Sequence, residues 1–462
     1  MKLVTRKLFN GECMKKRITL IVFSVLIIVA LYVLYCFNYI PHKKYTNADF
    51  NIEAYKSNID KDNDGIDDQT DILNNANNYI KTNPKYKSKY YNTGYPNDEY
   101  GVCTDVVAFA LKDAGYDVTI ISQDTGVSGK IQEKGLKTIN LPINKAGTNF
   151  RDEVKTFFFL YKLFRNQKPD IVHLVGLKIV LWGSLAAKLA GIKTMISAIC
   201  GLGVLFGETH AQSFMSRAIL RVLRITHKKK NIKVIFQNKD DKEIFLNAKI
   251  VKEEQCVLTN GSGINLQKYS YTPEPKKGIL KIIFTARMIE SKGVLILIDA
   301  AQKIKSEYLG KVQFLLCGRL DSNPEGITKE LLENKCDDVY IQWLGYREDV
   351  MKLIKQSHIM VFPSWYREGL PKSIIEAEAI GRPVITTDSV GCRDTVINGV
   401  NGFLIPIKDS DALAWALKKL IDNPDLRRFM GQKAREFAVN KFDIKDVIEA
   451  HLNAYKSLNK TE

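Results

Sequence analysis

The chain has 462 residues, enough for two or three domains, and 45% of them are hydrophobic, as in ordinary globular proteins. A formal net charge of +17 indicates an acidic partner, such as nucleic acid, anionic lipid or a phosphorylated substrate. The eight cysteines form no C-x-x-C pair, which argues against a zinc site or a disulfide scaffold.

The N-terminus predicts a membrane anchor. Residues 1–17 are a basic tail, and residues 18–40 form an apolar run that meets the roughly 20 residues needed to cross a bilayer. The basic tail also resembles the start of a signal peptide, but no small-residue cleavage site follows the run. The excess of Lys and Arg before the run places the N-terminus in the cytoplasm. We therefore predict a single-pass membrane protein whose transmembrane segment is an uncleaved anchor.

An acidic loop follows the anchor. Asp60, Asp62 and Asp64 alternate before Gly65, so their carboxylates can converge on a hard cation at the turn that glycine permits. Asp71 stands at the twelfth position, where it is shorter than the bidentate Glu of usual calcium loops. The pattern leaves two interpretations open: a Ca²⁺ site formed by these four aspartates, or a solvated acidic turn.

Residues 45–115 carry a further set of local signals. They include the string Y-I-K-T-N-P-K-Y-K-S-K-Y-Y and the segment Gly101-Val-Cys103-Thr-Asp105. This part resembles, in truncated form, a domain of unknown function in exported bacterial proteins that is distantly similar to papain-like cell-wall cysteine peptidases. The resemblance implies a thiol nucleophile at Cys103, at the start of a helix. The partner His of that family has no counterpart here, so we expect an inert thiol.

From residue 116 onward, strands and helices alternate regularly. Buried apolar runs predict five strands at 117–122, 137–142, 170–175, 193–199 and 233–238. The alternation indicates the first half of a doubly wound α/β fold, which we assign to residues 116–265. His173 lies near the end of the third of these strands, where a structural and a functional role are equally open.

One helix of this half has a basic face. Steps of four, three and four place Arg217, Arg221, Arg224 and Lys228 along one side of that helix. This face is either a solvated stripe or a surface for anionic lipid, and the basic, aromatic helix at 151–168 supports the second interpretation. An anionic membrane surface is therefore among the expected partners.

A second α/β half, which we assign to residues 266–440, follows a glycine- and proline-containing hinge. Its predicted strands are at 281–286, 312–317, 339–343, 359–363 and 383–387. We expect the helices at 409–421 and 441–457 to cross back and brace the first half. The second of these helices belongs to a C-terminal crossover segment at 441–462.

Two motifs follow strands of the second half. The residues concerned are Arg287, Lys292 and Gly293 after one strand, and Glu368, Gly369, Leu370 and Glu376 around the start of a helix. This edge of an open parallel sheet is where ligands bind. An alternative is that the acidic residues merely favour the dipole of the helix.

The two motifs match the R-x4-K-G and E-x7-E elements of retaining family-4 glycosyltransferases of the GT-B fold. The resemblance extends from about Ala108 to Leu458. It implies two doubly wound Rossmann-like domains, of which the first binds the acceptor and the second a nucleotide sugar. Gly201-Leu-Gly203 resembles the corresponding segment in a branch of this family that builds surface polysaccharides on a lipid carrier. Many relatives have a His before this segment, but Cys200 stands here, so no catalytic His is carried over.

The resemblance also implies roles for the motif residues. Arg287 and Lys292 would stabilise the charge that develops on the departing phosphate, so that transfer needs no metal cofactor. Glu368 would accept hydrogen bonds from the sugar, and Glu376 from the ribose. The remaining residues of the nucleotide-sugar site would be Gly293, Gly369 and Leu370. The expected reaction moves an N-acetylhexosamine-type sugar from a UDP-sugar to a lipid-linked or polysaccharide acceptor, with retention of configuration.

The first half lacks one element of this fold. The family's first strand and the loop after it have no counterpart before Thr104, so the chain resembles two proteins fused near residues 100–125. We therefore expect weak transfer or none, and an exported catalytic domain would also be separated from a cytoplasmic donor. The alternative function is a membrane-anchored exported module, calcium-binding or a cysteine-peptidase-like remnant, fused to an inactive glycosyltransferase. Nucleic acid is not an expected partner, because aromatic residues are not interleaved with the basic ones.

Overall fold

The computed structural model describes residues 103–123, 128–133, 135–143, 150–203, 214–321 and 325–459. The predicted anchor at 18–40, the four aspartates of the acidic loop and most of the predicted exported domain lie outside these residues. Within the described part, no helix is long and apolar enough to cross a membrane. The same part contains no group of three or more His, Cys, Asp or Glu side chains placed to hold a metal ion. Neither finding bears on the anchor or on the acidic loop.

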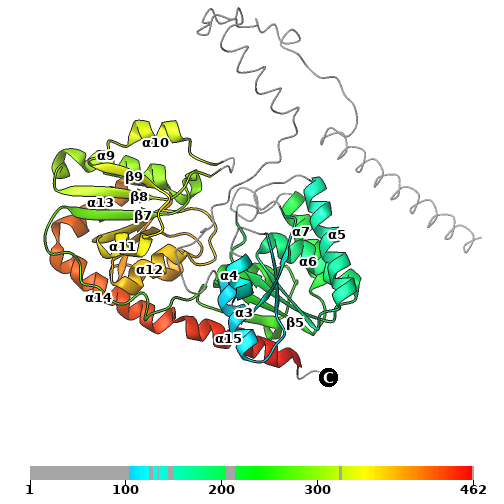
Figure 1. Ribbon diagram of the computed structural model, residues 1–462. Coiled ribbons are helices and arrows are strands. Elements are labelled where there is room, and N and C mark those ends of the chain that lie inside the picture. The colour runs from blue at the N-terminus through cyan, green and yellow to red at the C-terminus, as the bar shows by residue number, and fades with distance from the viewer. Residues whose placement is uncertain are drawn as a thin grey trace, which may run out of the picture. The chain divides into compact units, whose positions relative to one another are not determined.

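The first half is built on a parallel sheet of order β3-β4-β5-β6. Figure 1 labels β5 of this sheet and the helices around it. Its strands are β3 (Ile171–Val175), β4 (Thr194–Ile199), β5 (Ile232–Phe236) and β6 (Cys256–Leu258). The helices that follow or precede them are α5 (Phe150–Gln167), α6 (Leu177–Ala190), α7 (Phe214–Thr226) and α8 (Lys239–Asn247). β4 and β5 are largely apolar and almost wholly buried, as expected for central strands of a parallel sheet covered on both faces.

A separate pair of parallel strands precedes this sheet. β1 (Thr119–Ser122) pairs with β2 (Lys137–Asn140), next to α3 (Cys103–Asp113) and α4 (Ser128–Glu133). In a doubly wound sheet of order 3-2-1-4, the first strand lies between the second and the fourth. In this chain β1 corresponds to the second strand of that order and β3 to the fourth. Among the described residues, β1 pairs only with β2 and β3 only with β4, so the place between β1 and β3 has no described strand. Among the described residues, the break therefore falls at the place of the first strand, for which the sequence analysis predicts no counterpart.

The second half has one continuous parallel sheet of order β12-β11-β10-β7-β8-β9. Its strands are β7 (Leu280–Thr285), β8 (Val312–Cys317), β9 (Ile341–Gly345), β10 (Ile359–Phe362), β11 (Val384–Thr387) and β12 (Gly402–Ile405). Its helices are α9 (Val294–Tyr308), α10 (Lys329–Lys335), α11 (Val350–Lys355), α12 (Lys372–Ile380), α13 (Ser410–Asp422) and α14 (Pro424–Lys441). β10 and β11 are buried along their whole length, so both faces of the sheet are covered at its centre.

The ten predicted strands are confirmed, with ends within two residues of the observed ones. The short strands β6 and β12 were not predicted. The expectation that the helix at 409–421 crosses back was wrong, because α13 packs against α9 in the second half. Its apolar face, which includes Leu413, Leu417 and Leu420, belongs to the core of that half.

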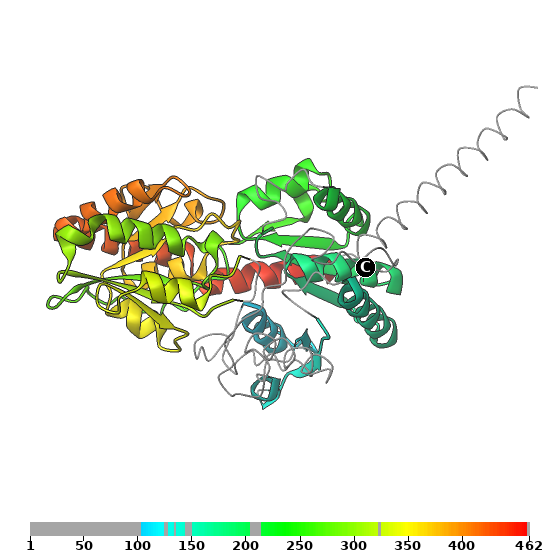
Figure 2. The same cartoon turned by 90° about the horizontal axis from the view of Figure 1, so that it is seen from above.

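The C-terminal helix α15 (Ile444–Asn459) does return to the first half. It packs against α3, β4 and β5, and both views show it on that half (Figures 1 and 2). Tyr455 and Leu458 share a buried cluster with Val107 and Leu111 of α3. The helix thus covers one face of the incomplete first half.

The chain passes between the halves twice, and the two passages are hydrogen-bonded to each other. The Ile264 amide donates to the Phe442 carbonyl at 2.7 Å, and the Ile444 amide donates to the Ile264 carbonyl at 3.1 Å. The turn before Ile264 is close to this contact, because a Cβ on Gly263 would lie 2.7 Å from the Ile444 Cα. The outgoing and returning segments therefore lie side by side.

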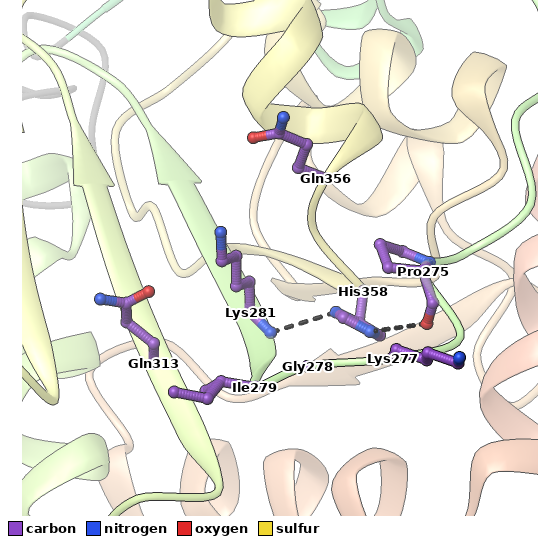
Figure 3. A pocket seen from close by; sticks show the side chains of 8 residues that line it. All are labelled: Pro275, Lys277, Gly278, Ile279, Lys281, Gln313, Gln356 and His358. Atoms are coloured by element: carbon purple, nitrogen blue, oxygen red, sulfur yellow. Dashed lines mark hydrogen bonds between the residues drawn. The ribbon is translucent and has the colours of Figure 1, made fainter.

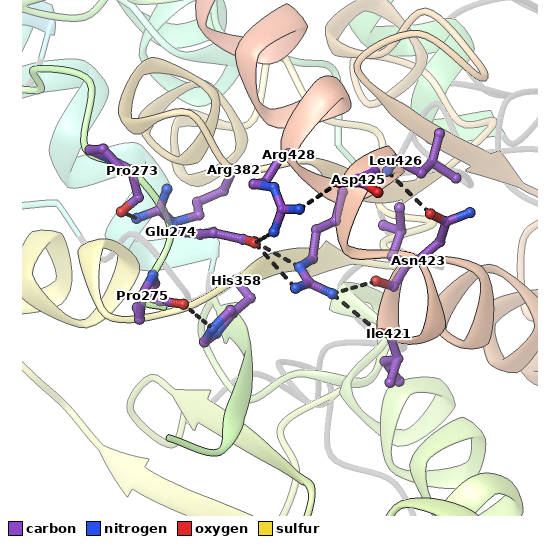
Figure 4. Close-up of polar contacts among 12 residues, drawn as sticks. Pro273, Glu274, Pro275, His358, Arg382, Ile421, Asn423, Asp425, Leu426 and Arg428 are labelled. Carbon is purple, nitrogen blue, oxygen red and sulfur yellow. Dashed lines mark hydrogen bonds and ion pairs between the residues drawn. The ribbon is translucent and has the colours of Figure 1, made fainter. Parts of the chain in front are cut away.

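A buried polar network fixes the linker that enters the second half (Figure 4). Arg427 donates to the Glu274 carboxylate through Nε at 2.7 Å and through Nη2 at 3.2 Å. Arg382 is fully buried and donates to the Thr272 carbonyl at 2.7 Å and to the Lys355 carbonyl at 2.8 Å. Burial lowers the pKa of Arg382 to about 10. Because a buried charge without partners is costly, these bonds hold the linker against α12 and α14.

Candidate functional site

The two sequence motifs meet at the carboxyl edge of the second sheet. β7 and β10 are parallel neighbours, so the segments that follow Thr285 and Phe362 leave the sheet side by side. The first segment carries Arg287 and Lys292, and the second carries Glu368. This is the edge at which open α/β sheets bind ligands.

Lys292 and Glu368 form an ion pair at this edge. The Lys292 Nζ contacts the Glu368 Oε1, and the two side chains are only 11% and 13% exposed. The ammonium also lies 4.8 Å from the centre of the Tyr366 ring, a favourable cation–π position. The Ser364 hydroxyl donates to the same Glu368 oxygen at 3.3 Å. The pair is thus held in a largely water-free setting, where charges interact more strongly than in bulk solvent.

Arg287 lies beside this pair and is more exposed. Its Nη1 donates to the Asp321 carboxylate at 2.8 Å, and its side chain is 42% exposed. Burial acts to lower the pKa of Arg287, but the hydrogen bond and charge of Asp321 raise it above its ordinary value, helped by Tyr366 and Glu368. The site therefore presents two cations. Sequence reasoning missed Asp321, which follows β8 with no motif of its own.

Gly293 allows the two motifs to approach each other. It ends the 3-10 turn Glu290–Lys292 with a φ of 81° and precedes α9. A Cβ at this position would overlap the Pro363 carbonyl at the end of β10. Just before it, the Ser291 carbonyl accepts a hydrogen bond from the Trp365 amide at 3.0 Å. Glycine is therefore required both by the left-handed backbone and by the close approach.

Glu376 lies on α12 and is largely buried. Tyr269 donates its hydroxyl to the Glu376 Oε1 at 3.1 Å, and the Lys372 ammonium lies 4.0 Å from the same oxygen. The predicted ribose-binding carboxylate therefore already has partners. Leu370 is buried in front of this helix and closely approaches Gly261 of the first half. No local signal marks Tyr269, which comes from the linker and precedes Glu376 by 107 positions.

A second carboxyl on α12 has a structural role. Glu378 is fully buried, and its Oε1 accepts a hydrogen bond from the Asn401 amide at 2.7 Å. Burial raises the pKa of Glu378 well above its ordinary value. In the sequence, Glu376 is distinguished from Glu378 only by its E-x7-E spacing from Glu368.

His173 has the structural role that the sequence left open. Its Nδ1 lies 3.0 Å from the Tyr455 hydroxyl of α15, and its ring lies 5.7 Å from that of His451. Burial, followed by the charge of His451, lowers the pKa of His173 to about 3. The ring is therefore neutral at ordinary pH and supports the packing of α15. The other candidate, Cys103, begins α3 as expected, but its side chain lies outside the described contacts.

A depression of about 440 Å³ lies at the opposite, amino edge of the second sheet (Figure 3). The His358 Nδ1 accepts a hydrogen bond from the Lys281 amide at 3.1 Å, so the proton is on Nε2, which donates to the Pro275 carbonyl at 3.1 Å. Burial lowers the pKa of His358. Both ring nitrogens are occupied by backbone groups, so this histidine organises the linker and is not free for chemistry.

Two families of known proteins match the sequence. Residues 271–437 match Glycosyl transferases group 1, and residues 97–238 match Glycosyl transferase 4-like. The fold is the GT-B-like fold of glycosyltransferases, with two parallel-sheet halves and the motifs at the carboxyl edge of the second. More particularly, the second half matches the group 1 model and much of the first half matches the glycosyltransferase 4-like model, and several of the relatives are bacterial glycosyltransferases.

Individual relatives agree with this assignment. The N,N'-diacetylbacillosaminyl-diphospho-undecaprenol alpha-1,3-N-acetylgalactosaminyltransferase of Campylobacter jejuni is 27% identical over 358 residues, which cover 75% of this chain and 92% of that protein. The UDP-Gal:alpha-D-GlcNAc-diphosphoundecaprenol alpha-1,3-galactosyltransferase of Escherichia coli is 26% identical over 351 residues, 72% of this chain and 87% of that protein. Anabaena HepE, solved with UDP-glucose, shares the fold with a TM-score of 0.59 at 16% identity, over 79% of this chain and 98% of that one.

Proposed function

We propose that this protein transfers a sugar of the N-acetylhexosamine type from a UDP-sugar to a lipid-linked acceptor, with retention of configuration. The observation that carries the proposal is the Lys292–Glu368 pair with Arg287 beside it, at the ligand-binding edge of the second sheet. Relatives that act on undecaprenyl diphosphate-linked sugars, and a neighbour of the same fold that holds UDP-glucose, support the donor and acceptor classes.

Arg287 and Lys292 are the groups that this chain offers to a departing diphosphate. The bond between the anomeric carbon and the β-phosphate oxygen breaks, and negative charge grows on that oxygen. Two preorganised cations stabilise this charge where it develops. Each cation has a carboxylate partner, Asp321 or Glu368, and the diphosphate would share those positive charges when bound.

Glu368 and Glu376 would bind the two ends of the donor. Glu368 would accept hydrogen bonds from sugar hydroxyls while it remains next to Lys292. Glu376, oriented by Tyr269, would accept hydrogen bonds from the ribose. The acceptor hydroxyl attacks the face from which UDP departs and gives its proton to the leaving diphosphate, which retains the anomeric configuration.

The first half would present the acceptor at an anionic membrane surface. Arg217, Arg221 and Arg224 of α7 are all exposed, as are Met215 and Ile225 on the same helix. Basic and apolar side chains that are exposed together favour the interface of an anionic bilayer. A lipid diphosphate held in such a bilayer would be brought close to the first half.

The test is transfer by the purified full-length protein from UDP-N-acetylhexosamines and UDP-galactose to a polyprenyl-diphosphate sugar. Product formation with the donor's configuration, read by NMR of the new linkage, is the expected result. Lys292→Ala should lower the rate of transfer about 100- to 1,000-fold, and Lys303→Ala, which removes a more exposed lysine of α9, should leave it unaltered. Transfer by Lys292→Ala at the unaltered rate would overturn the assignment.

The broken sheet of the first half favours a second outcome, in which UDP binds but transfer is weak. β1 and β3 each have one edge without a strand partner among the described residues, and a missing loop would remove part of the acceptor side. Buried unpaired backbone groups cost about 1–3 kcal/mol each, against about 5–15 kcal/mol for a whole fold. UDP binding with turnover far below about 1 s⁻¹ would distinguish this outcome from full activity.

A further inference from the structure

The backbone of the segment that carries Glu368 is held by the first half. Asn238 Nδ2 donates to the Glu368 carbonyl at 3.1 Å and to the Gly369 carbonyl at 3.0 Å. Asn238 is 3% exposed, and it is also the N-cap of α8, because its Oδ1 accepts from the Asp241 amide at 2.8 Å. One side chain thus joins the start of a helix in one half to the candidate catalytic loop of the other.

A buried ion pair reinforces the same contact. Arg367 Nε donates to the Asp241 carboxylate at 2.8 Å, with side-chain exposures of 15% and 0%. Asn238 Nδ2 also lies 3.2 Å from the other Asp241 oxygen. The residue before Glu368 is therefore tied to α8 as well. A buried pair of this kind specifies geometry, because either charge left alone in the interior is strongly unfavourable.

Glycines on both sides allow the loop backbone to lie this close. Gly201 has a φ of 107°, and a Cβ there would lie 2.6 Å from the Gly369 nitrogen. A Cβ on Gly391 of the second half would lie 2.5 Å from the Gly369 oxygen. A Cβ on Gly369 itself would lie 2.6 Å from the Cys200 carbonyl. The peptide at Gly369 is therefore enclosed by backbone from both halves.

We infer that Asn238 is a positioning residue, which sets the location of the Glu368 carboxylate from the first half through the loop backbone. The side chain of Glu368 contacts Lys292, and its carbonyl is bound by Asn238, so the residue is fixed at both ends. Asn238 touches neither the donor nor the leaving group in the proposed reaction, on whose existence this role depends. Asn238 can position Glu368 only while the two halves are in contact at this point.

The simpler interpretation is that Asn238 only caps α8, and a serine substitution separates the two roles. Serine is about as good an N-cap as asparagine. It lacks the amide that reaches the two carbonyls, so Asn238→Ser should keep α8 and lose the contact. Asn423 provides a matched control, because it caps α14 through the Leu426 amide at 3.4 Å. Asn423→Ser makes the same chemical change at the N-cap of α14, which has no part in the loop at residues 366–370.

The experiment combines hydrogen exchange with kinetics on the full-length protein. In Asn238→Ser, amides of residues 366–370 should exchange about tenfold faster, with a melting temperature lowered by only a few degrees and UDP affinity within about twofold. The turnover number should fall about tenfold with little change in KM for the donor. In a Glu368→Gln background the same substitution should lower the residual turnover less than about twofold, because coupled residues are not additive. Asn423→Ser should change none of these quantities.

Unaltered exchange at residues 366–370, or full additivity with Glu368→Gln, would overturn the positioning role. Unaltered exchange, turnover and melting temperature in Asn238→Ser would show that Asn238 is a cap and nothing more, because serine replaces the cap. If the unaltered protein transfers no sugar at all, the proposed function fails, and the exchange result still decides whether Asn238 positions the loop. The two failures are therefore distinguishable.

Discussion

The two halves follow the same α/β plan, but their described residues form sheets that differ in continuity. The second half has six strands in one sheet, with the cations and carboxylates of the candidate site at its edge. The described part of the first half has its strands in two separate sheets and relies on α15 to cover one face. The difference teaches that donor binding and transfer depend on different parts of the molecule. Under the proposed function, donor binding would be a property of the second half, whereas transfer would also need the contacts made by the first.

The largest expected effect tests the chemistry of the complete half. Lys292→Ala should lower turnover about 100- to 1,000-fold, because it removes a donor aimed at the developing phosphate charge. It also leaves Glu368 without its ion-pair partner in a nearly buried position. The measurement is steady-state transfer, and Lys303→Ala is the control. A loss confined to KM would mean that Lys292 only binds the ground state.

Donor affinity should depend on the second half alone. Glu376→Ala should weaken UDP binding by about 1.5–3 kcal/mol, the usual cost of a lost hydrogen bond to a charged group. Isothermal calorimetry on the full-length protein measures it. Glu307→Ala, which removes an exposed carboxylate of α9, is the control. Binding that is unaltered in Glu376→Ala would remove this residue from the nucleotide site.

The halves should also differ in how much stability they lose in acid. Burial lowers the pKa of His173 to about 3 and of His227 to about 4, and both lie in the first half. A histidine with a depressed folded pKa binds protons mainly when unfolded, so stability falls as pH drops below about 6.5. Each should cost the first half about 2 kcal/mol by pH 5. Asp241, whose pKa burial raises, opposes this trend only in part.

In the second half two pKa shifts oppose each other. Burial raises the pKa of Glu378, so the folded state holds a proton that the unfolded state releases above about pH 4.5. Burial also lowers the pKa of His358 in this half, which acts in the opposite direction. The two shifts offset each other in part, so this half should lose less stability than the first between pH 7 and pH 5. Hydrogen exchange at pH 7 and pH 5, corrected for the intrinsic rates, would resolve the two halves. Equal loss of protection in both would contradict the comparison.

The smallest expected effect concerns the membrane face of the first half. Arg217→Gln and Arg221→Gln should each weaken binding to phosphatidylglycerol vesicles by about 1 kcal/mol, the typical contribution of one basic residue near an anionic surface. Sedimentation with these vesicles measures it, with neutral phosphatidylcholine vesicles for comparison. Arg347→Gln, an exposed arginine of the second half, should have no effect. If all variants bind the anionic vesicles equally well, the basic side chains of α7 are only a solvated face of the helix.

Much of the second half was predictable because its signals are local. Runs such as Ile359–Phe362 are continuously apolar, and Lys292-Gly293 and Glu368 stand at fixed spacings from strand ends. The contacts of Tyr269 and Asn238 were not predictable, because each depends on packing between segments more than 100 positions apart. The direction of α13 was mistaken for a similar reason, since an amphipathic pattern shows that a face is buried but not against which element.

The paired passage at Ile264 and Phe442 has a mechanical consequence. Because the outgoing and returning chain are hydrogen-bonded to each other there, any change in the angle between the halves must bend both at the same point. Any separation of the halves about that point would break the bonds from Asn238 to the Glu368 loop. In the proposed reaction, the position of Glu368 would therefore depend on whether the halves are together.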